Sequence, residues 1–149
     1  MKRKFAVLFC AVVCAAAMAL TMAGCGSGEA TNDVTLTNIS SAIQSHGTGT
    51  YSHSMNISDL KTTYNIDSGD VLQFVAKHAG DPMGNAMVMI EATSDDAAHR
   101  IEEKLNSFVG MFSRVDMDTV VRHGKYVALF SDANDEKMAA AFSEFIVAE

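Results

Sequence analysis

Cysteine is scarce in this 149-residue sequence, which contains only Cys10, Cys14 and Cys25. The first two lie in an N-terminal apolar segment with the features of a secretory signal peptide, so we expect only Cys25 to remain in the mature chain. A single remaining thiol excludes an intramolecular disulfide, a CxxC redox pair and a cysteine-rich zinc site in the mature protein.

Basic residues are also few, with 11 Lys and Arg against 18 Asp and Glu. Lys2, Arg3 and Lys4 belong to the predicted signal peptide, so its removal leaves 8 basic against 18 acidic residues and a net charge of −10. Such a chain has no excess of cations to neutralise phosphates, which argues against binding to nucleic acid or a polybasic contact with anionic lipid. We interpret the negative charge as a source of solubility.

Motifs of the common enzyme and metal sites are missing from the sequence. It contains no HxH or HExxH pair, no glycine-rich phosphate loop and no GxSxG nucleophile elbow. The histidines are scattered along the chain, at His46, His53, His78, His99 and His123. A metal site of His46 and His53 with Asp59 is an alternative that no ligand spacing supports, so surface histidines are the favoured interpretation.

Ser58 and Lys61 fit the Ser-x-x-Lys pattern of penicillin-binding enzymes, in which the lysine helps to deprotonate the serine. The KTG element of those enzymes is absent, and the 125 residues left after cleavage are too few for that fold. We therefore interpret Ser58 as the N-cap of a short helix.

Residues 132–136 begin like a calcium-binding loop, but Lys137 stands where the loop needs glycine and Ser143 where it needs glutamate. The favoured interpretation is a capped, acidic helix start. Asp116 and Asp118 are a possible carboxylate pair, but no partner motif accompanies them and a solvated turn is favoured.

Methionines are frequent in the middle of the chain, at Met83, Met87, Met89, Met111 and Met117. Such clusters can form adaptable peptide-binding surfaces. Met87 and Met89 alternate within a predicted strand, however, and this spacing favours a role in filling the core.

The N-terminal segment has a positive start, an apolar run from Phe5 to Leu20 and small residues at its end. Its ending, Met22-Ala23-Gly24-Cys25, resembles the bacterial lipobox. The resemblance implies that diacylglycerol is attached to Cys25, that the signal peptide of residues 1–24 is cleaved, and that the new amine is acylated in many bacteria. The alternative, an uncleaved membrane anchor, is disfavoured because the run is short of the roughly 20 residues that a span needs.

After the anchor, the small and polar residues 25–33 predict a flexible tether, and residues 34–149 predict a single domain. Helices are expected within 34–44, with Thr37 or Asn38 as cap, and over 58–64. A long helix is expected to start at residues 93–96, with the buried stripe Ala98, Ile101, Leu105, Phe108 and Phe112. A last helix is expected after a cap at Asp132 or Asn134, with the buried stripe Met138, Ala141, Phe142, Phe145 and Ile146. A strand is favoured over a helix at Val71–His78, a central strand is expected at Ala86–Ala92 and a hairpin at 119–131 around Gly124, whereas 45–55 is expected to be a polar loop. The fold class that follows is α+β: an antiparallel sheet of about four strands, its apolar face covered by helices.

The order of these segments resembles a family of small lipoproteins from anaerobic Gram-positive bacteria whose C-terminal domain has no known function. The resemblance is based on Tyr64-Asn65-Ile66-Asp67, on the strands and long helix that follow, and on Gly124-Lys125-Tyr126-Val127, and it covers residues 58–147. It implies an uncharacterised extracytoplasmic lipoprotein and no active site.

These observations predict a non-enzymatic module that is lipid-anchored on the extracytoplasmic face of the cell membrane and binds a protein, peptide or envelope component. Cys25 is the one site residue expected, with no catalytic, cofactor or metal residue. The alternative is a carrier of a small ligand or cation beside a membrane transporter, and a small hydrolase is a third, less favoured class. A concave apolar cavity with converging polar groups favours the carrier, and a flat apolar patch favours partner binding.

Overall fold

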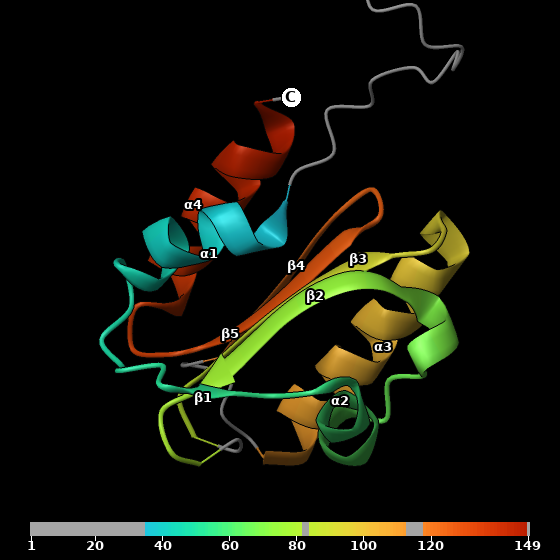
Figure 1. Cartoon of the computed structure of the whole chain (residues 1–149), viewed down its shortest axis with the longest axis horizontal. Coiled ribbons are helices and arrows are strands. Elements are labelled where there is room, and N and C mark those ends of the chain that lie inside the picture. Colours follow the sequence, from blue (N-terminus) through green and yellow to red (C-terminus); the bar gives the residue numbers. More distant parts are fainter. Residues whose placement is uncertain (1–34, 82–83, 113–117, 149) are drawn as a thin grey trace, which may run out of the picture. The chain divides into compact units, whose positions relative to one another are not determined.

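The computed structural model describes residues 35–81, 84–112 and 118–148 (Figure 1). Along the chain these residues form α1 (Leu36–Gln44), β1 (His53–Ser54), α2 (Ile57–Tyr64), the short 3-10 helix η1 (Ser68–Asp70), β2 (Val71–His78), β3 (Ala86–Ala92), α3 (Asp95–Phe112), β4 (Asp118–His123), β5 (Tyr126–Ser131) and α4 (Asp135–Val147). None of the described helices combines the length and the apolar character that a membrane span requires.

The described strands form one antiparallel sheet in the order β1-β2-β3-β5-β4. The α+β class is therefore confirmed, but the sheet has five strands rather than about four. The additional strand is β1, which pairs His53 with His78 and Ser54 with Lys77 inside the segment expected to be a loop. Two polar residues have no alternating pattern to detect, so only their pairing with β2 makes them a strand.

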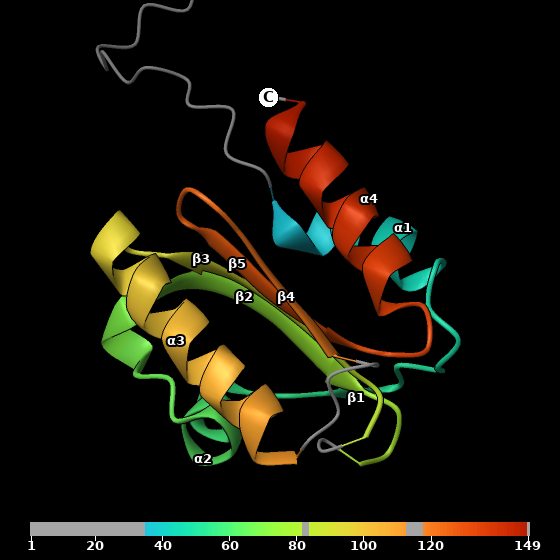
Figure 2. The ribbon, with the colours of Figure 1, turned by 180° about the vertical axis from the view of Figure 1, so that it is seen from behind.

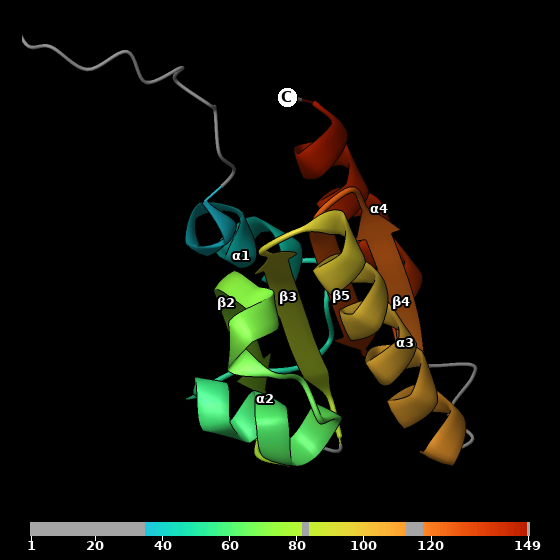
Figure 3. The same cartoon turned by 90° about the vertical axis from the view of Figure 1, so that its right-hand side faces the viewer.

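Helices cover both faces of the sheet, which corrects the expectation of one covered face. On β3, Val88 and Ile90 point into a core with α2 and α3, whereas Met87 and Met89 point into a second core with α1 and α4. All residues of β3 are buried because helices cover this strand on both faces, and six of the seven are apolar. The exception, Glu91, accepts hydrogen bonds from Gln73 and Lys125. Figure 1 shows the sheet between the two helix pairs, and Figure 3 shows α2 and α3 in front of it.

The predicted helical stripes are confirmed except at their C-terminal ends. In α3 the stripe residues Ala98, Ile101, Leu105 and Phe108 are buried, but Phe112 is 40% exposed. In α4 Phe142 is buried, but Phe145 is 39% exposed. Figure 2 shows the last turns of both helices extending beyond the strands. The periodicity continues there, but no sheet lies beneath these side chains to bury them.

The caps of α1 and α2 differ from the prediction. Asn56, not Ser58, is the N-cap of α2: its Oδ1 accepts hydrogen bonds from the backbone N–H groups of Ser58 and Asp59, and the Asp59 carboxylate accepts one from the Asn56 N–H at 2.7 Å. At α1 the N-cap position is Thr35 rather than Thr37 or Asn38. Where several cap-forming residues lie close together, the sequence does not rank them, and the packing of the helix decides.

The predicted strand at Val71–His78 and the predicted hairpin are both confirmed. Gly124 in the turn of the hairpin has a φ of 54°, a left-handed conformation that glycine adopts without steric cost. Near its start, β2 has a β-bulge between Val71 and Gln73, which leaves Leu72 without a residue opposite it on β3.

Candidate functional site

Strand β2 lies at one edge of the sheet for most of its length. Beyond the short β1, one further hydrogen bond joins the two segments, from the backbone N–H of Met55 to the carbonyl of Ala76 at 2.8 Å. The chain then turns away at Asn56 to begin α2. Among the described residues, no strand lies beside residues 71–75 of β2 on this side, so that part of the edge is open.

The backbone of Phe74 faces the open edge. The carbonyl of Ala76 points away from β3, because it accepts the hydrogen bond from Met55. Alternate residues of an antiparallel strand direct their N–H and C=O groups to the same side, and the register with β3 is regular from residue 73 to 78. The N–H and C=O of Phe74 therefore both point outward, where an added strand would pair with them.

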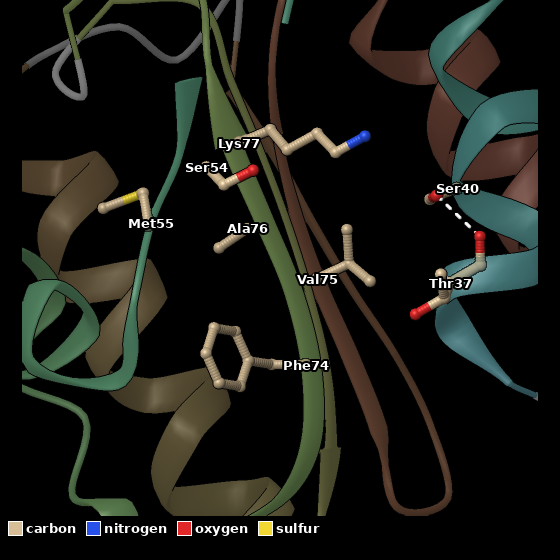
Figure 4. Close-up of a pocket in the computed structure, with 8 residues that line it drawn as sticks. All are labelled: Thr37, Ser40, Ser54, Met55, Phe74, Val75, Ala76 and Lys77. Carbon is tan, nitrogen blue, oxygen red and sulfur yellow. Dashed lines mark hydrogen bonds between the residues drawn. The ribbon is translucent and has the colours of Figure 1, made fainter. Parts of the chain in front are cut away.

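A groove of about 300 Å³ follows this edge (Figure 4). The residues that line it come from three parts of the chain: Thr37 and Ser40 of α1, Ser54 and Met55 around the end of β1, and Phe74, Val75, Ala76 and Lys77 of β2. Val75 and Lys77 lie on the side of α1, and Phe74 and Ala76 lie on the side of Met55. One wall thus carries hydroxyl groups and an ammonium group, and the other wall is apolar.

Lys77 is the charged residue of the groove, and the described chain holds no carboxylate against it. Its Nζ lies 3.5 Å from Oε1 of Gln44, a long contact with a neutral group. Most other described basic side chains are in ion pairs, Lys61 and Lys104 with Asp67, Arg100 with Asp70, Arg122 with Glu102 and Lys125 with Glu91. The positive charge of Lys77 is therefore left available to a bound molecule.

Comparisons with protein-family models, curated proteins and solved structures find no match.

A second hollow, of about 210 Å³, lies between the C-terminal parts of α2 and α3. Tyr64, Phe108 and Met111 are among its lining residues, as is Lys104, which is already paired with Asp67. Burial raises the pKa of the Tyr64 phenol, and the charge of Asp118 adds to this effect. The hollow is smaller than the groove, and its cation is already neutralised.

Asp132 is fully buried and holds three segments together. Its carboxylate accepts hydrogen bonds from the N–H and hydroxyl of Thr48, from the N–H groups of Gly49 and Asn134, and from the Tyr51 hydroxyl at 2.6 Å. Burial by itself raises the pKa of Asp132, but the hydrogen bonds from Tyr51, Asn134 and Thr48 outweigh it and lower the pKa. Burial and the neighbouring Asp132 raise the pKa of Tyr51.

This arrangement decides between the two interpretations of residues 132–136. The oxygens of Asp132 face N–H and O–H donors, so they are committed to the protein and not to a calcium ion. Asp135, in the first turn of α4, accepts a hydrogen bond from the Thr119 hydroxyl at 2.6 Å. Asn134 occupies the N-cap position of α4, but its side chain makes no capping hydrogen bond. The Asp132 carboxylate accepts a hydrogen bond from the Asn134 N–H, so both residues that were predicted as caps contribute to the start of the helix.

The structure does not bring the histidines together as a metal site. The described residues contain no cluster of three His, Cys, Asp or Glu side chains that would hold an ion, so His46, His53 and Asp59 do not converge. His53 instead stacks on His78 across the β1–β2 pair, with ring centroids 5.2 Å apart. The Nε2 of His123 lies 2.8 Å from the Ser143 hydroxyl.

The Ser-x-x-Lys pattern is not a catalytic pair in the structure. Lys61 Nζ lies 2.6 Å from the carboxylate of Asp67, while Ser58 is exposed in the first turn of α2. Hydrogen bonds from Lys61 and Lys104 lower the pKa of Asp67 to about 2. This lysine therefore stabilises a carboxylate instead of activating a serine.

Met87 and Met89 are fully buried, which confirms that they fill the core, whereas Met111 is 70% exposed. Asp118 is buried at the start of β4, so it is not in the solvated turn that was expected. Its predicted partner Asp116, together with Met83, Met117 and Cys25, lies outside the described residues.

Proposed function

We propose that this chain is a lipid-anchored, non-enzymatic interaction module on the extracytoplasmic face of the cell membrane, and that its groove along β2 binds a protein or peptide partner. The observation that carries the proposal is the open sheet edge at the base of that groove, with the unpaired charge of Lys77 beside it. Edge strands with free backbone groups are established binding sites for protein segments.

The shape of the groove favours a polymeric partner over the small ligand of a carrier. Its volume of about 300 Å³ is at the lower end of the range for small-molecule sites, which enclose most of the ligand surface. The lining of this groove is distributed along a strand, with polar groups on one wall and apolar groups on the other, instead of converging on one point. A partner polypeptide that lies along β2 would contact both walls of the groove.

Cys25 and the residues before it support the anchor. The ending Met22-Ala23-Gly24-Cys25 resembles a lipobox, and the small, polar residues 25–33 that follow have the composition of a tether. A tether of this length would let the domain stand roughly 15 Å from the bilayer. Two or more acyl chains on one residue give durable membrane attachment, whereas a single chain gives only marginal binding.

Replacing Cys25 with Ser is expected to abolish lipid attachment, because the hydroxyl group cannot take the place of the thiol in the modification. Cells fed with radiolabelled palmitate should incorporate label into the wild-type protein and none into Cys25→Ser. The variant should also persist at precursor size. Equal labelling of the two proteins would refute the anchor, as would an unprocessed wild-type precursor in healthy cells.

Partner binding is tested by photo-crosslinking in intact cells. A photoreactive amino acid at Leu72, which is 61% exposed and stands two residues before the groove residue Phe74, should trap one stoichiometric partner. The same amino acid at Asn106, exposed on α3, is the matched control and should not trap that partner. The adduct from Leu72 should be lost when Lys77→Glu reverses the charge of the groove. Identical products from both positions, or no adduct from Leu72, would contradict the proposed function.

A further inference from the structure

We infer that the occupant of the groove is an extended peptide segment that pairs with β2 as an additional strand and places a carboxylate beside Lys77. This inference rests on the proposed function and specifies its partner.

The segment would continue the line that β1 takes along β2. His53, Ser54 and Met55 run beside β2 as far as Ala76, and the chain leaves this line at Asn56. A segment that enters beside Val75 continues the same line. It would exchange two hydrogen bonds with Phe74, whose N–H and C=O point outward, and neighbouring strands in such a pair lie about 4.8 Å apart.

The length of the added strand is limited at both ends. The β-bulge at Leu72 interrupts the regular edge at one end, and β1 occupies it at the other. Bulges and short covering strands are devices by which proteins prevent indefinite strand addition. The edge therefore accepts a short segment, and it does not offer a template for a growing fibre.

The two walls specify an alternating side-chain pattern in the segment. Successive side chains of a strand point to opposite faces of the sheet, and residues opposite each other in neighbouring strands contact each other. On one face the segment would meet Phe74 and Met55, which favour apolar side chains. On the other face it would meet Thr37, Ser40 and Lys77, which favour polar side chains and one carboxylate.

Charge argues against a second copy of this chain as the occupant. The residues of β2, VLQFVAKH, include Lys77 but no acidic residue, so the β2 edge of another copy has no carboxylate to offer. The net charge of −10 that we expect for the mature chain also makes two copies repel each other. A peptide that carries a single acidic residue satisfies Lys77 without adding a large negative charge.

The test selects ligands without assuming a sequence. The full chain, reconstituted in lipid nanodiscs, is used to select binders from a random octapeptide library displayed on phage. Enriched peptides should share an acidic residue at a fixed position and alternate apolar with polar residues. They should bind Lys77→Gln about 3- to 5-fold more weakly than wild type, whereas Lys77→Arg keeps the charge and should retain most of the affinity.

Backbone pairing is tested with ester-substituted versions of a selected peptide. Replacing the amide that faces the Phe74 carbonyl with an ester removes one hydrogen bond and should weaken binding about 3- to 10-fold. An ester at the next position, whose N–H would face away from β2, should leave the affinity unchanged and is the matched control. In the complex, the backbone N–H of Phe74 should also become protected from hydrogen exchange.

The inference is overturned if no peptide is enriched, if the enriched peptides lack the acidic residue, if Lys77→Gln binds them as well as wild type, or if the two esters behave alike. None of these results depends on the palmitate or crosslinking experiments. Crosslinking to a partner from Leu72 together with failure here would leave the interaction module standing and refute only its strand-like ligand.

Discussion

Asp132→Ala is expected to lower the free energy of unfolding by about 3–5 kcal/mol, as measured by urea denaturation. The wild-type carboxylate is fully buried and satisfies donors from Thr48, Gly49, Tyr51 and Asn134. Removing it leaves several of these donors without an acceptor in the interior, and each unsatisfied buried group costs about 1–3 kcal/mol. The loss should also release the loop around Thr48, which is 84 residues away in sequence, from the start of α4.

The matched control is Glu136→Ala, which removes an exposed carboxylate in the first turn of the same helix. It gives up only a favourable interaction with the helix dipole and should cost about 1 kcal/mol or less. Similar losses in the two variants would show that the buried hydrogen bonds of Asp132 do not contribute as proposed.

The effect of Asp132 should depend on pH in a defined direction. Because the pKa of Asp132 is lower in the folded state than in the unfolded chain, its ionisation stabilises the fold above the unfolded pKa of about 3.9. This contribution is lost as the pH falls toward and through the lowered pKa. The stability difference between wild type and Asp132→Ala should therefore be constant from pH 7 to about 5 and decrease below about 4.

Phe142→Ala is expected to lower the free energy of unfolding by about 3–5 kcal/mol, because it leaves a cavity in the core between α4 and the sheet. Phe142 is fully buried and packs edge-to-face on Phe130 of β5, with ring centroids 5.9 Å apart. Phe145→Ala, on the same helix, is the matched control. Its ring is 39% exposed, so its loss should cost considerably less.

Urea denaturation of both variants, with circular dichroism to confirm retained helix content, measures this difference. Equal losses from Phe142→Ala and Phe145→Ala would mean that α4 does not pack on the sheet through the face that carries Met138, Ala141 and Phe142. A double-mutant cycle with Phe130→Ala should give a coupling energy of about 0.5–1.5 kcal/mol for the aromatic pair.

The candidate site was only partly visible in the sequence. Val75 and Lys77 belong to a strand that the alternation of apolar and polar residues predicts, and their common face follows from that alternation. Nothing local identifies that strand as an edge, since this depends on where β1 and β3 pair with it. The walls of the groove also include Thr37, Ser40 and Met55, and no sequence motif connects these residues with β2.

The sequence by itself determined the elements that have a strong local pattern: the strand at Ala86–Ala92, the hairpin around Gly124 and most of the buried stripes of α3 and α4. At Val71–His78 the sequence favoured a strand but also fitted a helix, and only the pairing with β3 decided between them. Periodicity and turn chemistry act over a few residues, so they can be read along the chain. They were sufficient for the α+β class.

Only the tertiary structure decided that helices cover both faces of the sheet and that β1 is a strand. It also decided that part of the edge of β2 has no neighbouring strand among the described residues, and that Asp132 binds the loop around Thr48, 84 residues earlier in the chain. Each of these features depends on contacts between segments that are far apart in the chain. Local patterns indicate which face of a segment is apolar. Which other segment packs against that face is decided only when the whole chain folds and buries its apolar surfaces.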